Sequence, residues 1–238
     1  MKYKKLVTLN DPKSTVSEVY RIMRTNLMFS SLDKPLNSFL VTSPGPAEGK
    51  SLTTANLGIA FAQYGKQVII VDADLRKPSQ HNIFGLDNSV GLTSVMLGEV
   101  SLNEALHKIE DTSLSVLTTG PLPPNPAELL GSERMQEVIE KIKRESDIVI
   151  LDTPPVVVVT DAALLAASVD GVLLVLASGK VKIEMAQKAQ ELLLNVRARI
   201  LGTVLNMMDE NNPDYYYYNN YEYGEKGKDR KKHKRRSR

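Results

Sequence analysis

The sequence contains the stretch Phe39-Leu-Val-Thr-Ser-Pro-Gly-Pro-Ala-Glu-Gly-Lys-Ser51, which joins a short apolar run to a helical pattern over Leu52–Tyr64. A strand, a turn that ends in Gly-Lys-Ser and a helix, in that order, are typical of a phosphate-binding P-loop. Main-chain amides around Gly49 and at the start of the helix can donate to phosphate oxygens, and a Cβ at Gly49 would crowd that approach. The sequence therefore predicts a site for a nucleoside triphosphate.

The residues of this loop have distinct expected roles. We expect Lys50 to contact the β- and γ-phosphates of ATP, and the hydroxyl of Ser51 to bind Mg²⁺. The first glycine of the usual pattern is replaced by Pro44, so we expect Gly45 to supply the permissive backbone. The predicted nucleotide-binding residues of the loop are Gly45, Pro46, Ala47, Glu48, Gly49, Lys50, Ser51 and Leu52.

Short β-rich runs alternate with helical patterns along the chain. Most of the runs are almost wholly apolar, as expected of parallel strands that are covered on both faces. Repeated strand, helix, strand units predict an α/β fold with a doubly wound, mostly parallel sheet. The expected strands are Phe39–Thr42, Val68–Val71, Ser115–Leu117, Ile148–Leu151, Val172–Leu176 and Ile200–Leu205. The expected helices are Ser14–Ser30, Leu52–Tyr64, Ser132–Glu145, Asp161–Ala167 and Val181–Val196.

Acidic residues follow two of these strands. Asp72 and Asp74 come at the end of one apolar run, and Asp152 comes at the end of another. Ligands of an open parallel sheet bind beyond the carboxyl ends of its strands, so we expect the three carboxylates near the P-loop. A helix cap or a turn is the structural alternative for each acid alone. Together with a P-loop, three acids favour a Mg²⁺ site with oxygen ligands and retained waters.

These residues give a first assignment of the chemistry. We expect Lys50, Asp72, Asp74 and Asp152 to be catalytic, because phosphoryl transfer depends on positioning and on charge neutralisation. Asp74 and Asp152 would act at Mg²⁺ with Ser51, directly or through water. Asp72 is the candidate base that accepts the proton of an attacking hydroxyl, with Mg²⁺ binding as its alternative role.

Composition excludes several other classes of protein. The 238 residues include no cysteine, which rules out disulfides, a thiolate nucleophile and cysteine-bound metal centres, and which suits a reducing, cytoplasmic location. No apolar run approaches the ~20 residues of a membrane span, and no signal-peptide pattern opens the sequence. We expect any membrane association to come from a partner or from electrostatics.

The Gly-Lys-Ser loop, the Asp72-x-Asp74-x-Arg76 strand end and the Asp152-Thr-Pro-Pro strand end together resemble the motifs of the bacterial tyrosine kinases (BY-kinases). The likeness includes Thr118-Thr-Gly-Pro-Leu-Pro-Pro-Asn-Pro-Ala-Glu128 and covers nearly the whole chain. It is greatest to the stand-alone cytoplasmic kinases of Gram-positive capsule and exopolysaccharide operons. These kinases share their fold with the partitioning and septum-site ATPases.

The resemblance implies a set of activities and partners. It implies ATP- and Mg²⁺-dependent tyrosine autophosphorylation, a ring of identical subunits, a membrane adaptor that activates the kinase and recruits it to the inner face of the membrane, a cognate tyrosine phosphatase and protein substrates. It also implies control of polysaccharide synthesis or export. Asn206, just past the last expected strand, resembles the residue that holds adenine in this superfamily, with a simple turn residue as the alternative.

Within the superfamily, partitioning-type ATPases carry an extra lysine at the second position of the P-loop. Gly45 occupies that position here, which argues against that subgroup. A partitioning or positioning switch ATPase without kinase activity remains the main alternative function, and a basic-tailed nucleic-acid binder with a vestigial P-loop is a third.

Six of the nine tyrosines lie close together near the C-terminus. They are Tyr215, Tyr216, Tyr217, Tyr218, Tyr221 and Tyr223. No apolar periodicity surrounds them, so we expect phosphate acceptors, with an inert tail or a nucleic-acid-stacking segment as alternatives. The last expected strand ends at the phosphate edge, and ~9 residues of ~3.3 Å would let the cluster reach a neighbouring subunit, which predicts transfer in trans.

A basic run follows the tyrosines at residues 225–238. It holds nine Lys or Arg against two acids, a local balance of +7, so the rest of the chain carries −5 of the total of +2. We expect this run to favour anionic membrane near its surface, and we expect no specific nucleic acid. The predicted organisation is a flexible N-terminus at 1–13, a P-loop kinase domain at 14–208 and a disordered tail at 209–238.

The helix at 14–30 is expected to serve in assembly. Val16, Val19, Tyr20, Met23 and Leu27 share one stripe that we expect to dock on the domain. Glu18, Arg21 and Arg24 are expected on the opposite side, where a solvated face is the default. Their spacing resembles the subunit-contact motif of the family, which implies oligomer contacts.

Overall fold

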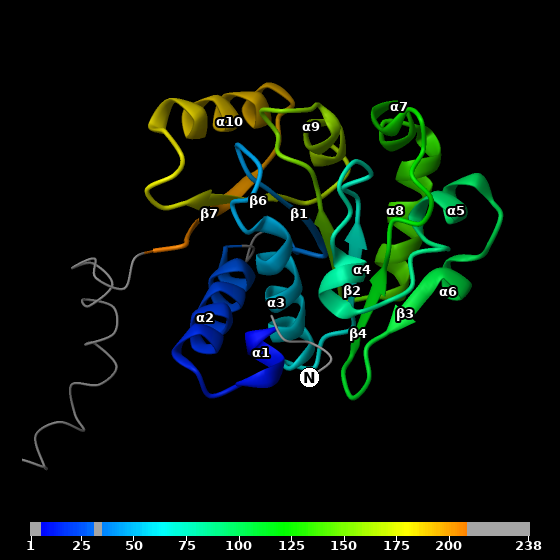
Figure 1. The fold of residues 1–238 in the computed structure, drawn as a ribbon, viewed down its shortest axis with the longest axis horizontal. Helices are drawn as coiled ribbons and strands as arrows, with labels where there is room; N and C mark the ends of the chain where they lie inside the picture. Colours follow the sequence, from blue (N-terminus) through cyan, green and yellow to red (C-terminus); the bar gives the residue numbers. More distant parts are fainter. Residues whose placement is uncertain (1–5, 31–34, 209–238) are drawn as a thin grey trace, which may run out of the picture.

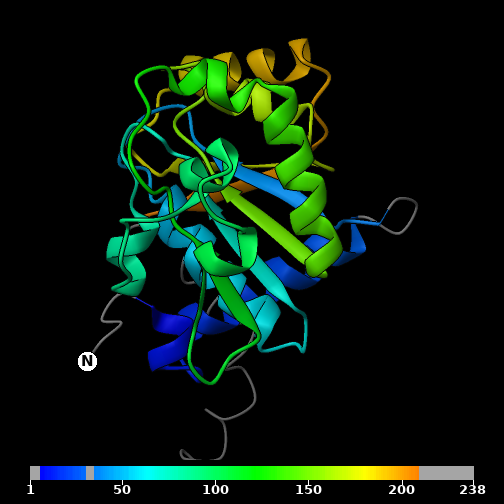
Figure 2. The ribbon, with the colours of Figure 1, turned by 90° about the vertical axis from the view of Figure 1, so that its right-hand side faces the viewer.

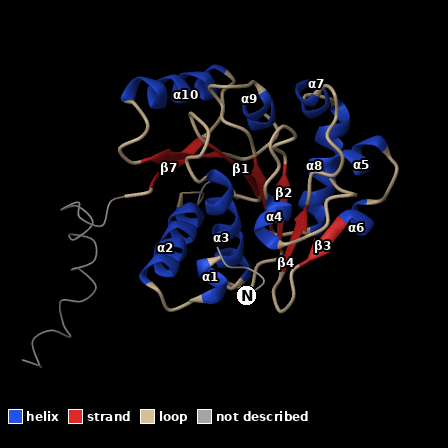
Figure 3. Ribbon diagram, in the orientation of Figure 1, coloured by secondary structure: helices blue, strands red, loops and turns tan. Residues whose placement is uncertain are grey.

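A seven-stranded sheet forms the centre of the protein, and it is parallel except at one edge (Figure 1, Figure 3). The computed structural model describes residues 6–30 and 35–208. The strands are β1 (Ser38–Thr42), β2 (Val68–Asp72), β3 (Leu106–Lys108), β4 (Leu114–Leu117), β5 (Ile148–Asp152), β6 (Val172–Ala177) and β7 (Ile200–Asn206). Their order in the sheet is β3-β4-β2-β5-β1-β6-β7, and only β3 runs antiparallel, on β4. The predicted fold class is therefore confirmed, with one edge strand that the sequence did not indicate.

Helices cover both faces of the sheet. The helices are α1 (Val7–Asn10), α2 (Thr15–Phe29), α3 (Lys50–Ala62), α4 (Gln80–Phe84), α5 (Leu92–Leu97), α6 (Leu102–Ala105), α7 (Pro126–Leu130), α8 (Glu133–Glu145), α9 (Asp161–Ala166) and α10 (Ile183–Asn195). One buried cluster joins the sheet to α3 and the N-terminal helices, and a second joins it to α5, α8, α9 and α10. Figure 2 shows the sheet between these two layers. Burial on both faces explains why β1, β2 and β5 are apolar along nearly their whole length.

Because six of the strands are parallel, their carboxyl ends lie along the same side of the sheet. Strand β1 lies between β5 and β6, and β2 lies between β4 and β5. The segments that follow these strands therefore meet, and they include the P-loop and the three acids. None of the helices in the described ranges is both long and apolar enough to cross a bilayer.

The N-terminal segment differs from the flexible terminus expected at residues 1–13. Leu6 and Thr8 are buried, and helix α1 follows directly. The hydroxyl of Thr8 donates to the side-chain oxygen of Asn56 at 2.9 Å, which ties α1 to α3. Residues 6–9 thus pack on the domain, through the buried side chain of Leu6 and the hydrogen bond between Thr8 and Asn56, whereas residues 10–13 are exposed.

Helix α2 begins and ends as predicted, but its buried face is rotated. Ser17 is buried, and its hydroxyl donates to the main-chain oxygens of Val7 in α1 and of Asp11 directly after α1. These contacts turn the Ser17 side of α2 toward the domain. Tyr20, Met23 and Leu27 pack on the core as expected. Val16 and Val19 do not, since about half of each side chain is exposed.

The charged residues of α2 also differ from the expected outward arc. Arg24 lies against α3, where its Nη1 donates to the main-chain oxygen of Ala60 at 3.1 Å and its guanidinium stacks 4.4 Å from the ring centre of Tyr64. Glu18 and Arg21 form an ion pair with each other. Only these two of the three remain on the outer side of the helix. The tyrosine cluster, the basic run and the rest of the expected disordered tail lie outside the described residues.

Candidate functional site

The P-loop connects β1 to α3, and its shape depends on two left-handed residues. Gly49 has φ +89°, and a Cβ there would lie 2.1 Å from Nδ2 of Asn206. Ala47 has φ +59°, whereas Gly45 is not in the left-handed region. The expectation that Gly45 supplies the permissive backbone is therefore wrong, because the reversal of the chain falls two residues later. Gly49 is required for two reasons, its backbone angle and the closeness of Asn206.

Glu48 holds the front of the loop, a role that the sequence did not indicate. Its side chain is buried. Oε1 accepts from the amide of Gly45 at 2.6 Å, and Oε2 accepts from the amide of Ala177 at 3.1 Å. Asn206, the last residue of β7, donates to the main-chain oxygen of Glu48 at 2.9 Å. The loop is thus fastened to the ends of β6 and β7.

Lys50 points into a group of carboxylates. Its Nζ lies 3.1 Å from Oδ2 of Asp74 and 3.6 Å from Oδ1 of Asp152, and it donates to Oγ of Ser51 at 3.2 Å. Burial alone would lower the pKa of the ammonium, but the charges of Asp152 and Asp74 outweigh it and raise that pKa. The structure therefore brings Lys50, Ser51, Asp74 and Asp152 together, as predicted.

Asp72 lies in the same place but makes a different set of contacts. Oδ2 accepts from the amides of Ser79 and Gln80 at 2.9 and 2.8 Å, and Oδ1 accepts from the amide of Asp74 at 3.3 Å. The side chain is fully buried. Burial, followed by the nearby charge of Asp152, raises the pKa of Asp72 to about 7. A carboxyl group with such a pKa can exchange a proton near neutral pH.

Gln80 is the principal site residue that sequence reasoning missed. It is fully buried, and its Nε2 donates to Oδ2 of Asp152 at 2.8 Å and to the main-chain oxygen of Ser51 at 3.0 Å. Both partners are acceptors, so this orientation of the amide is required. Oε1 of Gln80 is left buried with no hydrogen-bond partner. A lone glutamine carries no motif, and only its position after the second acidic strand end could have drawn attention to it.

Arg76 and Asp161 form a second contact that the sequence did not indicate, because the two residues lie 85 positions apart in the chain. The guanidinium donates through two nitrogens to the two carboxylate oxygens, at 2.9 and 3.0 Å. Asp161 is fully buried at the start of α9, and its hydrogen bond to Arg76 raises the pKa of the guanidinium. The pair connects the segment after β2 to that after β5, and so fixes the side of the site next to Asp74.

The donor set fits a hydrated divalent cation better than a cage of three acids. In the described part of the chain, no three acidic, histidine or cysteine side chains are arranged to hold a metal ion by themselves. The oxygens of Asp72 already accept hydrogen bonds from main-chain amides. Oδ1 of Asp152 and Oε1 of Gln80 are buried acceptors that receive no hydrogen bond, although Oδ1 lies 3.6 Å from Nζ of Lys50. Such acceptors suit Mg²⁺, which keeps several waters.

The comparisons with known proteins agree with this geometry. The family model ParA, described as NUBPL iron-transfer P-loop NTPase, matches residues 37–235. The tyrosine-protein kinase YwqD of Bacillus subtilis (strain 168) is 46% identical over 214 residues, which cover 90% of each chain. The putative tyrosine-protein kinase CapB of Staphylococcus aureus is 39% identical over 209 residues, covering 87% of this chain and 92% of that one.

Two solved structures lead to the same family. The crystal structure of the chimerical protein CapA2B2 matches with a TM-score of 0.84 and 40% identity, and covers 87% of this chain and 92% of that chain. The kinase domain of the Escherichia coli tyrosine kinase ETK matches with a TM-score of 0.83 and 31% identity, over 87% and 81% of the two chains. Because these similarities extend over most of each chain and include the P-loop edge of the sheet, the chain belongs to the bacterial tyrosine-protein kinases, nucleotide-binding enzymes of the ParA-like P-loop fold.

Proposed function

We propose that the chain transfers the γ-phosphate of ATP to the tyrosines at 215–223 of a second copy, and that this reaction regulates capsule or exopolysaccharide synthesis or export. The observation that carries the proposal is Lys50 set among Asp74, Asp152 and Ser51 at the end of a P-loop. The resemblance of the whole chain to tyrosine-protein kinases supports the choice of acceptor.

Lys50 and the loop amides bind the phosphates of ATP in this proposal. Nζ of Lys50 leaves Asp74 and Asp152 when a phosphate, which carries more negative charge, enters the loop. Ser51, Asp74 and Asp152 would hold Mg²⁺, directly or through water, and the free Oε1 of Gln80 would be available as an acceptor for a water beside them. The cation supplies charge neutralisation at the phosphates when bound.

Asp72 is the proposed base. The tyrosine oxygen forms a bond to the γ-phosphorus, the bond from that phosphorus to the bridging oxygen of ADP breaks, and the phenolic proton passes to the carboxylate. A pKa of about 7 suits this task, since a free tyrosine has a pKa near 10. The alternative, in which Asp72 helps to hold Mg²⁺, is less well supported because its oxygens already accept three amides.

Asn206 is proposed to hold the adenine. Its Nδ2 donates to the P-loop at the carbonyl of Glu48, so its Oδ1 can accept from the amino group of a base placed beside the loop. The other nucleotide contacts are the loop residues 45–52.

The partners follow from the same family. We infer protein substrates, a cognate tyrosine phosphatase and a membrane adaptor that activates the kinase and brings it from the cytoplasm to the inner face of the membrane. The basic run at 225–238 adds attraction to anionic lipid, at about 1 kcal/mol for each basic residue close to the surface.

Assembly into a ring is proposed to use α2. Val16, Val19 and Ile22 form an apolar ridge that is about half exposed, and the ion pair of Glu18 and Arg21 flanks it. Arg24 contributes by holding α2 on α3.

The deciding experiment incubates the full chain with labelled ATP and Mg²⁺ and maps the phosphate onto residues. We expect label on the tyrosines at 215–223. Lys50→Met should lower the rate by about 10²–10³, the effect of removing one preorganised transition-state donor. Lys141→Met, at an exposed position of α8, is the matched control and should keep the full rate. An unchanged rate in folded Lys50→Met would refute the site.

A switch ATPase without kinase activity is the second candidate, because the ParA family model also matches the chain, although Gly45 argues against that subgroup. It predicts ATP hydrolysis with no phosphotyrosine on the chain. The same experiment separates the two, because only the kinase places phosphate on the tyrosines at 215–223.

A further inference from the structure

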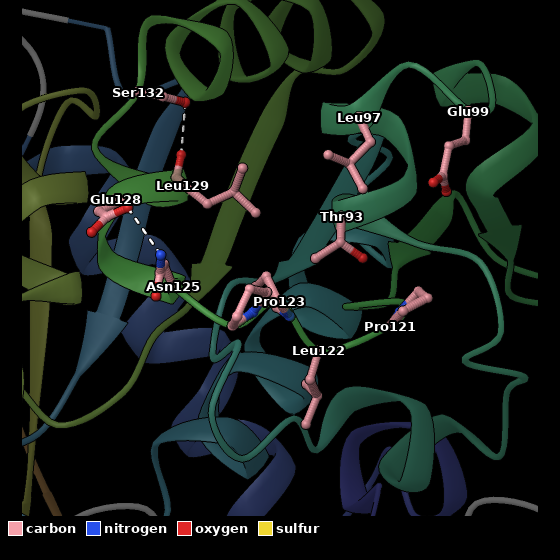
Figure 4. Close-up of a pocket in the computed structure, with 11 residues that line it drawn as sticks. Thr93, Leu97, Glu99, Pro121, Leu122, Pro123, Asn125, Glu128, Leu129 and Ser132 are labelled. Carbon is pink, nitrogen blue, oxygen red and sulfur yellow. Dashed lines mark hydrogen bonds between the residues drawn. The ribbon is translucent and has the colours of Figure 1, made fainter.

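A groove of about 510 Å³ lies between the segment after β4 and helices α5 and α7, apart from the P-loop (Figure 4). One wall comes from Leu97 and Thr93 of α5, and the other from Leu129 of α7. The floor is the proline-rich segment 121–125. In Figure 4 the side chains of Leu97, Thr93 and Leu129 lie around the space between α5 and α7, and the side chain of Leu122 extends downward from the floor segment, away from Leu97.

The lining is apolar with acidic side chains at its edge. Leu97 and Leu122 are 66% and 56% exposed, which is high for large apolar side chains. The charged lining residues are Glu99 and Glu128, and no lysine, arginine or histidine lines the groove. Neither carboxylate belongs to an ion pair in the described part of the chain. Chemistry of this kind fits a peptide that carries aromatic rings and positive charges.

The groove begins at the catalytic edge of the sheet. Thr119, two residues before Pro121, donates to the main-chain oxygen of Asp72 at 3.1 Å. Thr93 donates to the main-chain oxygen of Thr119 at 3.0 Å. The chain just before the floor segment is therefore held against the main chain of the proposed base. A peptide in the groove can place neighbouring residues within reach of the reacting phosphate.

We propose that the groove binds the tail of a second copy, with the basic run 225–238 beside Glu99 and Glu128 and tyrosine rings against Leu97 and Leu122. The proposal rests on the proposed function and names the surface that selects its acceptor. The tail supplies the matching chemistry, since nine Lys or Arg follow six tyrosines directly. Two residues separate the last tyrosine, Tyr223, from the first lysine of the run, Lys226. In extended chain this is a distance of about 10 Å.

The position of the tail in the chain favours a second copy as its source. The tail follows β7 at one end of the sheet, whereas the groove lies at the other end, beyond β4 (Figure 1). A head-to-tail contact places the tail-bearing end of one copy next to the groove-bearing end of the next. Repetition of one such contact generates a ring when the rotation closes.

The test uses two full-length proteins. The kinase copy carries Tyr→Phe at all six cluster positions, so it cannot be an acceptor, and the acceptor copy carries Lys50→Met, so it cannot be a kinase. Phosphate on the acceptor is followed against acceptor concentration. We expect Leu122→Ser in the kinase copy to lower kcat/KM by about tenfold, the loss of one well-buried apolar contact. Glu99→Lys with Glu128→Lys should have a similar effect at low salt that weakens as salt is added.

Matched controls lie away from the groove. Glu145→Lys reverses an exposed charge at the end of α8, just before β5 begins. Leu194→Ser truncates an exposed leucine of α10. Both should leave kcat/KM unchanged. An acceptor whose tail has its nine basic residues replaced by glutamate should react poorly with the unsubstituted kinase and better with the kinase that carries both lysines. ATP affinity of every groove variant should stay unchanged, because the groove does not contact the P-loop.

The outcomes separate the two proposals. Loss of transfer from groove substitutions in the kinase copy alone supports the groove. Equal loss from the same substitutions in the acceptor copy alone overturns docking by a second copy, since the tail would then lie in its own groove. Normal transfer with every groove variant overturns the groove and leaves the proposed function intact. If groove variants transfer phosphate normally but form a smaller assembly in light scattering, tail binding by the groove is also overturned. The groove would then contact another surface of the neighbouring copy. Absence of phosphate on the unsubstituted acceptor overturns the proposed function itself.

Discussion

Asp72 is a buried carboxyl group whose pKa is raised to about 7, by burial first and by Asp152 second. A folded-state pKa above the unfolded value of 3.8 means that the folded state holds the proton more tightly. The resulting stability is full below the unfolded pKa and is lost as pH rises through 7. The loss between pH 5 and pH 8 is about 3 kcal/mol by linkage.

Asp72→Asn should remove this dependence in the nucleotide-free protein, since the amide cannot ionise. We expect the difference in Tm between variant and unsubstituted protein to become more positive from pH 5 to pH 8. Thermal unfolding at both pH values measures it, with Asp111→Asn, an exposed substitution, as the control. A difference in Tm that does not change with pH would show that Asp72 is ionised throughout.

Gln80 connects the P-loop to Asp152 through two hydrogen bonds of its amide nitrogen. Gln80→Leu keeps most of the volume and removes both donors. We expect Mn²⁺, bound with a non-hydrolysable ATP analogue, to bind about 10- to 100-fold more weakly, as for other residues that orient metal ligands. Electron paramagnetic resonance measures free Mn²⁺ directly.

The matched control for this substitution is Gln63→Leu. Gln63 also donates from its side chain to a main-chain oxygen, that of Thr8 at 2.9 Å, but at the far end of α3. Equal Mn²⁺ affinity in the two variants would mean that Gln80 is structural only.

At the scale of elements, the P-loop and β7 meet at Gly49. Gly49→Ala places a Cβ 2.1 Å from Nδ2 of Asn206 and keeps φ at +89°. Gly65→Ala offers a control, because its φ is +85° and nothing lies within 4 Å of the new Cβ. Both variants should lose about 1 kcal/mol of unfolding free energy from the left-handed backbone.

The difference between these two variants isolates the contact with β7. We expect Gly49→Ala to lose at least a further ~1 kcal/mol, because a backbone shift is required. Urea unfolding of both proteins measures the difference. Equal stability would indicate that Asn206 moves aside at no cost.

Helix α2 combines a docked face with an exposed apolar ridge. Val19→Lys adds a charge to the ridge without touching the core, since half of the side chain is exposed. We expect a folded monomer, whereas the unsubstituted protein should form a larger species in light scattering, with its adaptor fragment present if needed. Alanine at Glu18, Arg21 and Arg24 should also give monomers, with some loss of stability because Arg24 packs on Tyr64.

Leu194→Lys on α10 is the control for the ridge, because Leu194 is equally exposed but belongs to another helix. It should assemble normally. Unchanged assembly of Val19→Lys would exclude the ridge as a contact.

The elements that sequence analysis predicted well are those with a local signal. The strands before Asp72 and Asp152 are uninterrupted apolar runs, and the P-loop is contiguous. Helices α4 to α7 have at most six residues each, which is too few to establish a helical period. The rotation of α2 escaped detection because the position of Ser17 against α1 depends on a tertiary contact.

At the scale of the molecule, the contacts that complete the site join distant parts of the chain. Gln80 and Asp152 are 72 residues apart, and Arg76 and Asp161 are 85 apart. A single sequence gives no spacing rule for such pairs. Alternating strands and helices do predict parallel strands with their carboxyl ends on the same side of the sheet. The sequence therefore predicts where the acids meet, but not the strand order or the side chains that orient the acids. The tyrosine cluster, which carries the proposed acceptor role, lies outside the described residues and stays a prediction.

Asn206 belongs at once to the sheet, to the phosphate loop and to the root of the tail. Its main-chain oxygen accepts from the amide of Ser178 at 2.8 Å, its side chain donates to Glu48, and the described chain ends two residues later. A pull on the tail therefore loads these two bonds first, and the second of them ends on the loop itself. Tension on a tail that is held by a partner would reach the phosphate-binding amides through the side chain of Asn206 alone. Conversely, a nucleotide that stiffens the loop would hold the start of the tail more firmly.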